Sequence, residues 1–202
     1  MELVNALIRL KAIADIGLVH TIDNYDKERY VEIQSIVFEL MSQISNQPLP
    51  FIQDFFKEAV DYPTPKVDIR ALVLNEKSQI LLVQEGSDSK WALPGGWADI
   101  GFSPAEVAVK EVWEETGLRV KVDRLLAVFD KKSHPHPHQA IYVYKLAFLC
   151  TYLEGNFKKS FDILDVGFFD VDRLPPLSEN RILASQIHIL LEQLQKNMVY
   201  FD

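Results

Sequence analysis

The sequence predicts an α+β protein with two parts: a small helical N-terminal domain over residues 1–64 and a larger domain with a mixed β-sheet over residues 65–202. Two observations support this division. Apolar residues of the first part recur every three or four positions, as on one face of a helix, whereas those of the second part form short runs typical of strands. Prolines in the run DYPTPKVD, between the two patterns, indicate a linker.

The N-terminal part contains two long amphipathic segments. The first has an apolar stripe of Leu3, Ala6, Leu7, Leu10, Ile13 and Ala14, and the second has one of Tyr30, Ile33, Val37, Leu40 and Ile44. A third helix is predicted near residues 51–60. Because about 60 residues are few for an independent core, these stripes need a partner surface, and we expect docking or a homodimer to bury them.

The second part contains five runs that predict strands: VDIRALVL, QILLVQE, VKVDRLLAVF, AIYVYKLAFLC and VGFFDV. The run NEKSQ predicts a hairpin turn between the first two. One helix interrupts the strands, and an amphipathic helix from about Arg181 to Gln195 follows them. The predicted sheet is therefore mixed, with helices packed against it.

The interrupting helix has clear ends and an acidic side. The run SPAE at residues 103–106 is typical of a capping box with proline in the first turn, and Gly117 is typical of a helix end. Glu111, Glu114 and Glu115 repel one another near the negative end of the helix dipole, at a cost of roughly a few tenths of a kcal/mol each. Such an acidic side is either merely solvated or binds a hard divalent cation such as magnesium, which prefers oxygen ligands.

A glycine loop precedes this helix in the run WALPGGWADIGFSP. The segment at residues 94–96, Pro-Gly-Gly, has little side-chain bulk and can bring its backbone to a metal ion or a phosphate. The spacing from this loop through the helix resembles the Nudix box, on the following residues: Gly96, Glu111, Val112, Glu114, Glu115, Gly117 and Leu118. Two positions depart from the family pattern, because Phe102 stands where the family usually has glutamate and Lys110 where it usually has arginine.

The resemblance implies an α/β/α Nudix sandwich. The helical N-terminal segment, together with LDVGFF and a following LPPLS, is similar to the branch of nucleoside-diphosphate-X hydrolases, whose members are described as ADP-ribose or CDP-choline pyrophosphatases. In this family, water attacks one phosphorus of a diphosphate, and a nucleoside monophosphate and a phosphorylated X are released. The resemblance therefore implies a small nucleoside diphosphate derivative as substrate and magnesium, or alternatively manganese, as cofactor.

The resemblance also implies roles for the box residues. Glu111 and Glu115 would be metal ligands, Glu114 a further ligand or an orienting group, and the Gly95 carbonyl a backbone ligand. Lys110 would orient the glutamates by its charge, without the planar fork of an arginine. The general base stays open between a box glutamate and a carboxylate from a later loop, where the chain offers Glu154, Asp162 and Asp165.

Three residues near the glycine loop are candidates for substrate contacts. Trp97 and Phe102 lie in or beside the loop, where they either line a substrate cleft or belong to an ordinary loop surface. Arg70, at the start of a predicted strand, either contacts a phosphate or is a solvated strand-edge arginine.

The run DKKSHPHPHQ places His134, His136 and a third histidine alternately with prolines between two predicted strands. Three alternatives stay open: a soft-metal site, a solvated loop, and a semi-rigid substrate loop in which the histidines and Lys131 or Lys132 contact a diphosphate or the X group. The last alternative predicts contacts that strengthen as pH falls toward about 6, because histidine has an ordinary pKa of about 6.5.

Composition narrows the class of protein further. The net charge of -8 disfavours nonspecific binding to nucleic acid or to anionic membranes. Charged residues interrupt the apolar N-terminus, so we expect neither a signal peptide nor a membrane span, and a cytoplasmic protein. A nucleotide-binding sensor that has lost catalysis is the alternative to an enzyme, because Phe102 and Lys110 depart from the box, although the three glutamates argue for catalysis.

Overall fold

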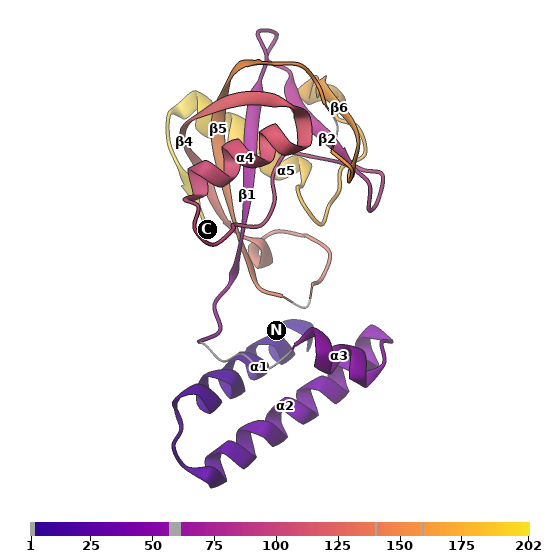
Figure 1. Cartoon of the computed structure of the whole chain (residues 1–202), viewed down its shortest axis with the longest axis vertical. Helices are drawn as coiled ribbons and strands as arrows, with labels where there is room; N and C mark the ends of the chain where they lie inside the picture. Colours follow the sequence, from indigo (N-terminus) through magenta and orange to yellow (C-terminus); the bar gives the residue numbers. More distant parts are fainter. Residues whose placement is uncertain (1–2, 57–61, 140, 159) are drawn as a thin grey trace. The chain divides into compact units, whose positions relative to one another are not determined.

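The computed structural model describes residues 3–56, 62–139, 141–158 and 160–202. The chain forms two compact units (Figure 1), which we call the helical unit, Met1–Pro65 with His138–Tyr142, and the sheet unit, Lys66–Pro137 with Val143–Asp202. Within the described ranges, every helix is too short or too polar to cross a lipid bilayer.

The helical unit consists of α1 (Leu3–His20), α2 (Asn24–Ser45) and α3 (Leu49–Phe55). Its core contains Leu7, Val37, Phe38, Met41 and Ile52. Asp15 is buried on α1, where its carboxylate accepts hydrogen bonds from Lys11 at 2.6 Å and from Gln34 of α2 at 2.7 Å. The two helices predicted from the apolar stripes are confirmed. The third begins at Leu49, and residues 57–60 of its predicted range lie outside the described residues.

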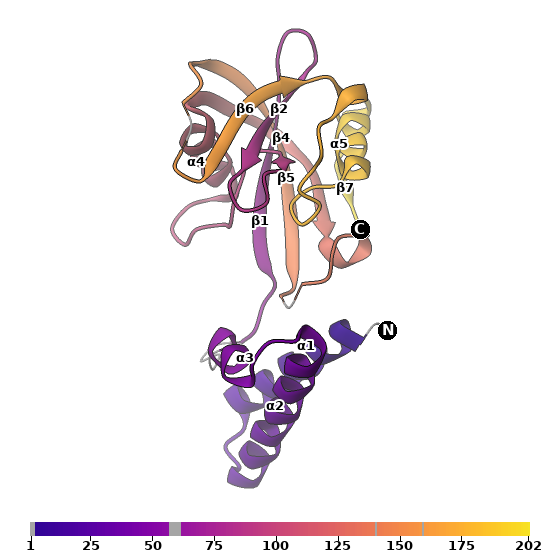
Figure 2. The same cartoon turned by 90° about the vertical axis from the view of Figure 1, so that its right-hand side faces the viewer.

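The described residues of the sheet unit form seven strands: β1 (Lys66–Leu74), β2 (Ile80–Glu85), β3 (Trp91–Ala92), β4 (Leu118–Asp130), β5 (Val143–Gly155), β6 (Ile163–Phe169) and β7 (Tyr200–Phe201). Their order is β3-β2-β1-β5-β4-β7, with β6 paired to β2 (Figure 2). The pairs β1/β5 and β4/β7 are parallel and the others antiparallel, so the predicted mixed sheet is confirmed. Short 3-10 helices η1 (Lys131–Ser133) and η2 (Val171–Arg173) follow β4 and β6.

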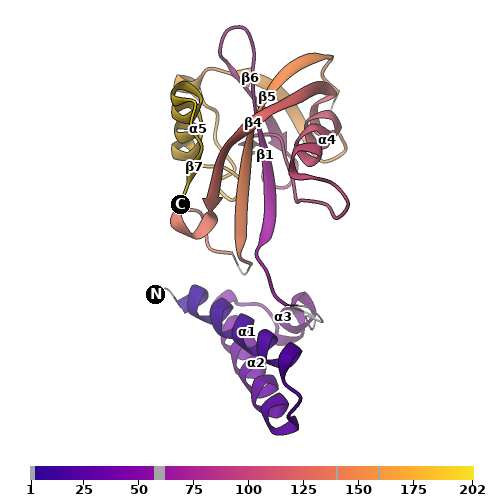
Figure 3. The ribbon, with the colours of Figure 1, turned by 90° about the vertical axis from the view of Figure 1, so that its left-hand side faces the viewer.

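Two helices cover opposite faces of this sheet (Figure 3). On one face, α4 (Pro104–Thr116) packs Val107, Ala108 and Val112 against alternate residues of β1, β2 and β5. On the other face, α5 (Ala184–Lys196) packs Ile187 and Leu190 against the intervening strand residues, such as Leu72, whose side chains point to that face. These two apolar cores make the sheet unit an α/β/α sandwich, as the sequence predicts.

The ends of α4 are those that the sequence predicts. The Ser103 hydroxyl accepts from the Glu106 backbone N–H at 3.3 Å, and the Glu106 carboxylate accepts from the Ser103 N–H at 2.7 Å, which completes the capping box. Gly117 ends the helix with a φ of +75°, and a Cβ there would lie 2.6 Å from the Asn156 carbonyl oxygen. Glycine is therefore required at this position on both conformational and steric grounds.

Candidate active site

The glycine loop before α4 runs beside β1 and hydrogen-bonds to it like a short strand. The N–H of Ala71 donates to the Pro94 carbonyl at 2.9 Å, and the N–H of Ile69 donates to the Gly96 carbonyl at 2.8 Å. Gly95, between these two carbonyls, has a φ of +147°, and a Cβ there would lie 2.0 Å from the Ile69 oxygen. Only glycine fits this approach, so the backbone of β1 fixes the position of the loop.

Two carboxylates of α4 converge on this loop. Glu115 is buried, and its Oε2 accepts the Gly95 backbone N–H at 2.9 Å. One helical turn earlier, the carboxylate of Glu111 lies against Gly96, where an added Cβ would be 3.0 Å from its oxygens. The two side chains therefore meet at the loop because residues four apart share one side of a helix.

Burial makes the negative charges of these two glutamates costly. It raises the pKa of Glu115 to about 8, although Arg70 and the Gly95 N–H favour the charged form. Burial also raises the pKa of Glu111, and Lys110 opposes that shift. Buried carboxylates of this kind are stabilised by a bound cation.

Lys110 holds the more exposed acids beside this pair. Its Nζ lies 3.0 Å from the Glu114 carboxylate, 3.2 Å from that of Asp99 and 3.9 Å from that of Glu111. The lysine therefore supplies the positive charge that the family's arginine would supply at this position, in contacts that need no planar fork. Glu114 is paired with Lys110, and its role as a further ligand or as an orienting group stays a prediction.

A cleft of about 940 Å³ adjoins these acids. It brings the box glutamates together with Asp162, one of the three loop carboxylates considered as a base. The residues that line it are Glu111, Trp113, Glu114, Glu115, Gly117, Asn156, Phe157, Lys158, Ser160, Phe161 and Asp162. Asp162 accepts a hydrogen bond from the Ser160 hydroxyl, and its backbone carbonyl accepts the Gly86 N–H at 2.7 Å.

The donor set at the loop fits a hard divalent cation. Among the described ranges, no three His, Cys, Asp or Glu side chains are grouped closely enough to enclose a metal ion. Glu111 and Glu115 nevertheless offer two carboxylates beside the backbone of Gly95. One or two carboxylates, completed by water and substrate phosphates, are the usual protein ligands of magnesium.

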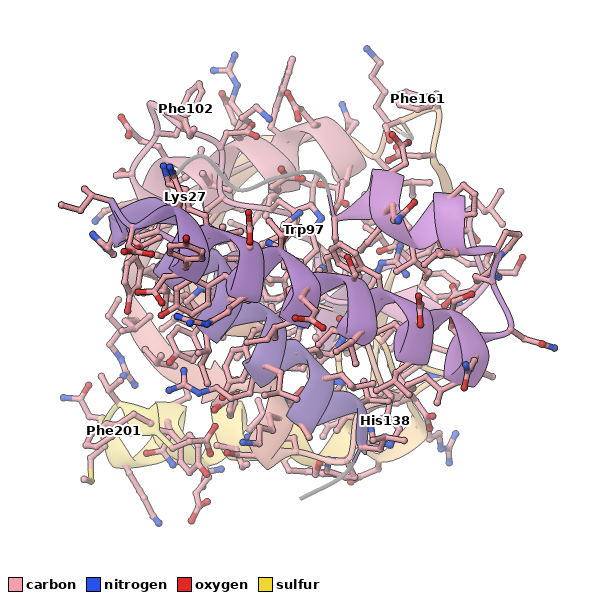
Figure 4. The ribbon with its side chains drawn as sticks, turned by 90° about the horizontal axis from the view of Figure 1, so that it is seen from below. Lys27, Trp97, Phe102, His138, Phe161 and Phe201 are labelled. Atoms are coloured by element: carbon pink, nitrogen blue, oxygen red, sulfur yellow. The ribbon has the colours of Figure 1, made fainter. Side chains whose placement is uncertain are left out.

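Other candidate residues lie outside the lining of this cleft. Asp165 is on β6 opposite Gln84, and Glu154 pairs with Arg119 at 3.3 Å on the surface. Trp97 and Phe102 are about half exposed, and Lys66 lies over the Trp97 ring at 5.7 Å. In Figure 4, Phe102 and Phe161 lie near opposite ends of α4, so the cleft at Phe161 is not the surface on which Phe102 lies.

The expectation of a solvated strand-edge Arg70 is wrong. Its guanidinium is buried, donates to both oxygens of Asp68 at 2.7 and 3.0 Å, and donates to the Leu93 carbonyl at 3.0 Å. Although burial opposes it, Arg70 and Lys145 hold the pKa of Asp68 below its ordinary value. Arg70 therefore ties β1 to the residue that enters the glycine loop.

Of the alternatives for the histidine run, a fully solvated loop does not describe His134 and His136, which are half buried and have polar partners. His134 lies 3.1 Å from the Asp202 carboxylate, and Nδ1 of His136 lies 2.5 Å from the Glu179 carbonyl. Burial lowers the pKa of His136 to about 4. His136 therefore stays neutral between pH 8 and 6, and the predicted gain of charge over that range is wrong for this residue.

Sequence reasoning missed several charged residues of the sheet unit. Asp68, Lys145 and Glu85 are all buried, and Arg181 lies 2.8 Å from the Glu85 carboxylate. The signal was present, because VDIRALVL, YKLAFLC and LLVQE each contain a charged residue within an apolar strand. Buried charges are normally paired, so such residues indicate an internal charge network.

A mixed sheet between two helices, with a glycine loop that receives the carboxylates of one helix, defines a Nudix domain. The chain belongs to the Nudix family: residues 64–188 match the family described as "NUDIX domain", and residues 1–56 match "UDP-X-like, N-terminal oligomerisation domain". It is a Nudix hydrolase, a class of enzyme that generally uses divalent metal ions.

Relatives extend this similarity over both parts of the chain. A Bacillus subtilis (strain 168) protein named "Putative ADP-ribose pyrophosphatase YjhB" is 42% identical over 187 residues, which cover 93% of this chain and 89% of that protein. A crystal structure of a UDP-X diphosphatase matches with a TM-score of 0.66 and 39% identity over 98% of this chain and 97% of that one. An ADP-ribose pyrophosphatase from Streptococcus suis 89-1591 matches with a TM-score of 0.62 and 40% identity, covering 69% of this chain and 100% of its own.

The close approach of Gly95 to β1 predicts the effect of a single methyl group. Gly95→Ala should displace the loop, and with it the N–H that orients Glu115, so we expect metal affinity to fall about 10- to 100-fold, as when a ligand loses its supporting contact. Titration calorimetry with a divalent metal ion measures this directly. Gly101→Ala is the matched control, because Gly101 also has a positive φ, +95°, but an added Cβ there meets nothing within 4 Å. Equal metal affinity in both variants would contradict the role of the loop.

Proposed function

We propose that this enzyme hydrolyses the diphosphate linkage of a nucleoside diphosphate joined to a further group X, with magnesium as its cofactor. One observation carries the proposal: Glu111 and Glu115 converge on the Gly95–Gly96 backbone at the edge of a cleft that also contains Asp162. A cleft with clustered carboxylates suits a phosphorylated substrate that arrives with a divalent cation.

The substrate class is supported by the names of the relatives. One relative is named as an ADP-ribose pyrophosphatase, and a solved structure of similar length is a UDP-X diphosphatase. ADP-ribose, UDP-linked compounds and CDP-choline share one reacting group, a diphosphate between a nucleoside and X. We propose this shared group as the target of the reaction, with a nucleoside monophosphate and a phosphorylated X as products.

Glu111 and Glu115 would hold the metal ion, with the Gly95 carbonyl as a backbone ligand. A bound divalent cation neutralises charge that develops on phosphoryl oxygens and lowers the pKa of a coordinated water. Lys110 keeps Glu114 and Glu111 oriented through its ammonium group. The chain itself would thus supply two carboxylates and a backbone loop that β1 holds in place.

Asp162 is the residue that we propose as the general base. In the reaction, a water oxygen bonds to one phosphorus, the anhydride P–O bond breaks, and the departing phosphate keeps the electron pair of that bond. The proton lost by the water needs an acceptor at the same cleft. Asp162 lines that cleft, whereas Glu154 and Asp165 do not line it.

The structure weakens the case for a sensor without catalysis. That alternative depended on the lysine and phenylalanine that depart from the family pattern. Lys110 contacts Glu111 and Glu114 as a cation at that position should, and Phe102 lies outside the cleft that contains the acids. Neither departure removes a group from the proposed metal site.

A substrate panel with magnesium tests the proposed function. ADP-ribose, UDP-sugars and CDP-choline are incubated with enzyme, and phosphate released from the products by a phosphatase is measured. On the best substrate, we expect Glu111→Gln and Glu115→Gln each to lower turnover by at least about a hundredfold, because each removes an electrostatic stabiliser of the transition state.

The fold should survive both substitutions, because each replaces a carboxyl group whose negative charge is costly at this site and keeps the side-chain shape. Glu154→Gln, on the surface outside the cleft, is the matched control and should retain wild-type turnover. Unchanged magnesium-dependent turnover in both the Glu111 and the Glu115 variants would reject these residues as ligands.

The assignment of the base is tested by two neighbouring aspartates. Asp162→Asn should lower turnover about 10²- to 10⁴-fold, the usual effect of losing a general base, with metal affinity unchanged. Asp165→Asn, on β6 and outside the lining of the cleft, should leave turnover near that of wild type. Comparable turnover in the two variants would show that Asp162 is not the base.

We further propose that the helical unit mediates a homodimer. Three apolar residues of α2, Ile36, Leu40 and Ile44, are spaced by four and remain exposed, and Leu10 and Ile13 of α1 are exposed as well. The unit's own core does not cover this stripe, and an exposed apolar stripe of this kind is typical of a protein interface. The matched family description, "N-terminal oligomerisation domain", supports the same role.

Ile36→Lys should shift the protein from dimer to monomer in sedimentation velocity, because it places a charge in the exposed stripe of α2. Ile36 is already exposed in the single chain, so the helical unit itself should stay folded by circular dichroism. Glu28→Gln changes the net charge by the same amount at an exposed site off the stripe and serves as the control. A dimer that persists in Ile36→Lys would place the interface elsewhere.

A further inference from the structure

A group of buried cations lies on the α5 face of the sheet, apart from the carboxylates at the glycine loop. Lys145 of β5 is paired in register with Asp68 of β1 on one side and with Phe129 of β4 on the other. Lys131 follows β4 directly, in η1. Phe129 belongs to the core beneath α5, and register partners point to the same face of a sheet, so Asp68 and Lys145 face that side too.

These cations outnumber the anions that contact them. Asp68 is the carboxylate partner of both Lys145 and Arg70. Lys131 donates to the Asn180 carbonyl at 2.7 Å, a neutral acceptor. Lys145 and Lys131 are only 2% and 7% exposed, so solvent does little to stabilise their charges. Arg181, which also lies near, is engaged by Glu85 at 2.8 Å and Asp88 at 3.8 Å.

Two further features are consistent with a ligand site at this group. Burial, together with neighbouring cations, lowers the pKa of Lys131 and of Lys145 to about 8 each. His136 interacts with both lysines, and its Nε2 is buried and has no hydrogen-bond partner within the described part of the chain. Because its Nδ1 must donate to the Glu179 carbonyl, Nε2 of the neutral ring is an acceptor, suited to a hydroxyl group.

We propose that Lys131 and Lys145 form an anion-binding subsite that receives phosphoryl oxygens of the substrate, with His136 accepting from a hydroxyl group on the same ligand. The inference rests on the proposed function for the identity of the ligand, but not for the binding of the anion. Ammonium groups held in a buried site make strong charge-assisted hydrogen bonds to phosphoryl oxygens. A purely structural role would need only the pair between Lys145 and Asp68 and the hydrogen bond from Lys131 to the Asn180 carbonyl, which gives the buried charge of Lys131 a neutral acceptor but no anion of its own.

Inorganic diphosphate is the probe that separates this subsite from catalysis. Its binding to the full-length protein is measured by titration calorimetry in the presence of a chelator, so that metal-dependent binding does not contribute. Lys131→Met should raise the dissociation constant at least about tenfold, the scale of losing one hydrogen bond to a charged group. Lys132→Met changes the adjacent, exposed lysine in the same way and should bind as wild type does.

Lys131→Arg keeps the charge and should recover most of the affinity, which a role in packing alone does not predict. Lys145→Met should also weaken binding, provided that circular dichroism shows it folded, but the conclusion depends on the Lys131 variants. Wild-type affinity in Lys131→Met, or no binding of diphosphate to the wild-type protein, would overturn the subsite. This experiment measures binding and no hydrolysis. A failure of the proposed function would therefore leave its outcome unchanged, and a failure of the subsite would leave the test of the proposed function unchanged.

Discussion

The hydrogen bond from the Gly95 N–H to the Glu115 carboxylate is the contact on which the site depends. It joins a loop that β1 holds in place to a helix that packs on the same face of the sheet. The loop end is fixed by its pairing with the β1 backbone and by Arg70, which holds the Leu93 carbonyl just before it. The helix end is fixed separately, because α4 packs its apolar side on the sheet. A side chain at position 95 would collide with the Ile69 carbonyl oxygen, so the geometry of the loop requires glycine at this position.

This contact also explains why α4 tolerates its acids. The helix is stabilised locally by the glycine that ends it and by its capping box, whose N-cap residue is worth about 0.5 to 2 kcal/mol in typical helices. Those contributions exceed the few tenths of a kcal/mol that roughly apply to each repulsive pair. Lys110 reduces the repulsion further by contacting Glu111 and Glu114. The acids that remain costly are the half-buried Glu111 and the buried Glu115, the two that meet the loop.

Local signals in the sequence predicted most helices and strands. The environments of individual side chains depend on contacts between distant parts of the chain, and the sequence did not predict them. The capping box, the glycine loop and five strands follow from periodicity and turn residues, because these depend on neighbours in the chain. The two short strands, β3 and β7, were missed because two residues carry no period. Arg70 was misjudged although its partner Asp68 lies two residues earlier on β1, because its burial and its contact with the Leu93 carbonyl depend on the fold. The partner of His136, the Glu179 carbonyl, lies 43 residues further along the chain. The sequence left the general base open between a box glutamate and the later carboxylates Glu154, Asp162 and Asp165, and of these three Asp162 lines the cleft.

The two charged groups of the sheet unit meet at Arg70. Its guanidinium is committed to Asp68 on the side of the lysines, and it is also close enough to Glu115 to favour that residue's charged form. Arg70 only partly offsets the cost of charging the buried Glu115, and Lys131 donates its hydrogen bond to a neutral carbonyl and not to a carboxylate. A divalent metal ion bound to a diphosphate carries both charges in one complex. If the metal ion binds the glutamates and the diphosphate binds the lysines, as proposed, each ligand neutralises buried charge that the other does not. Binding of either one should therefore favour binding of the other.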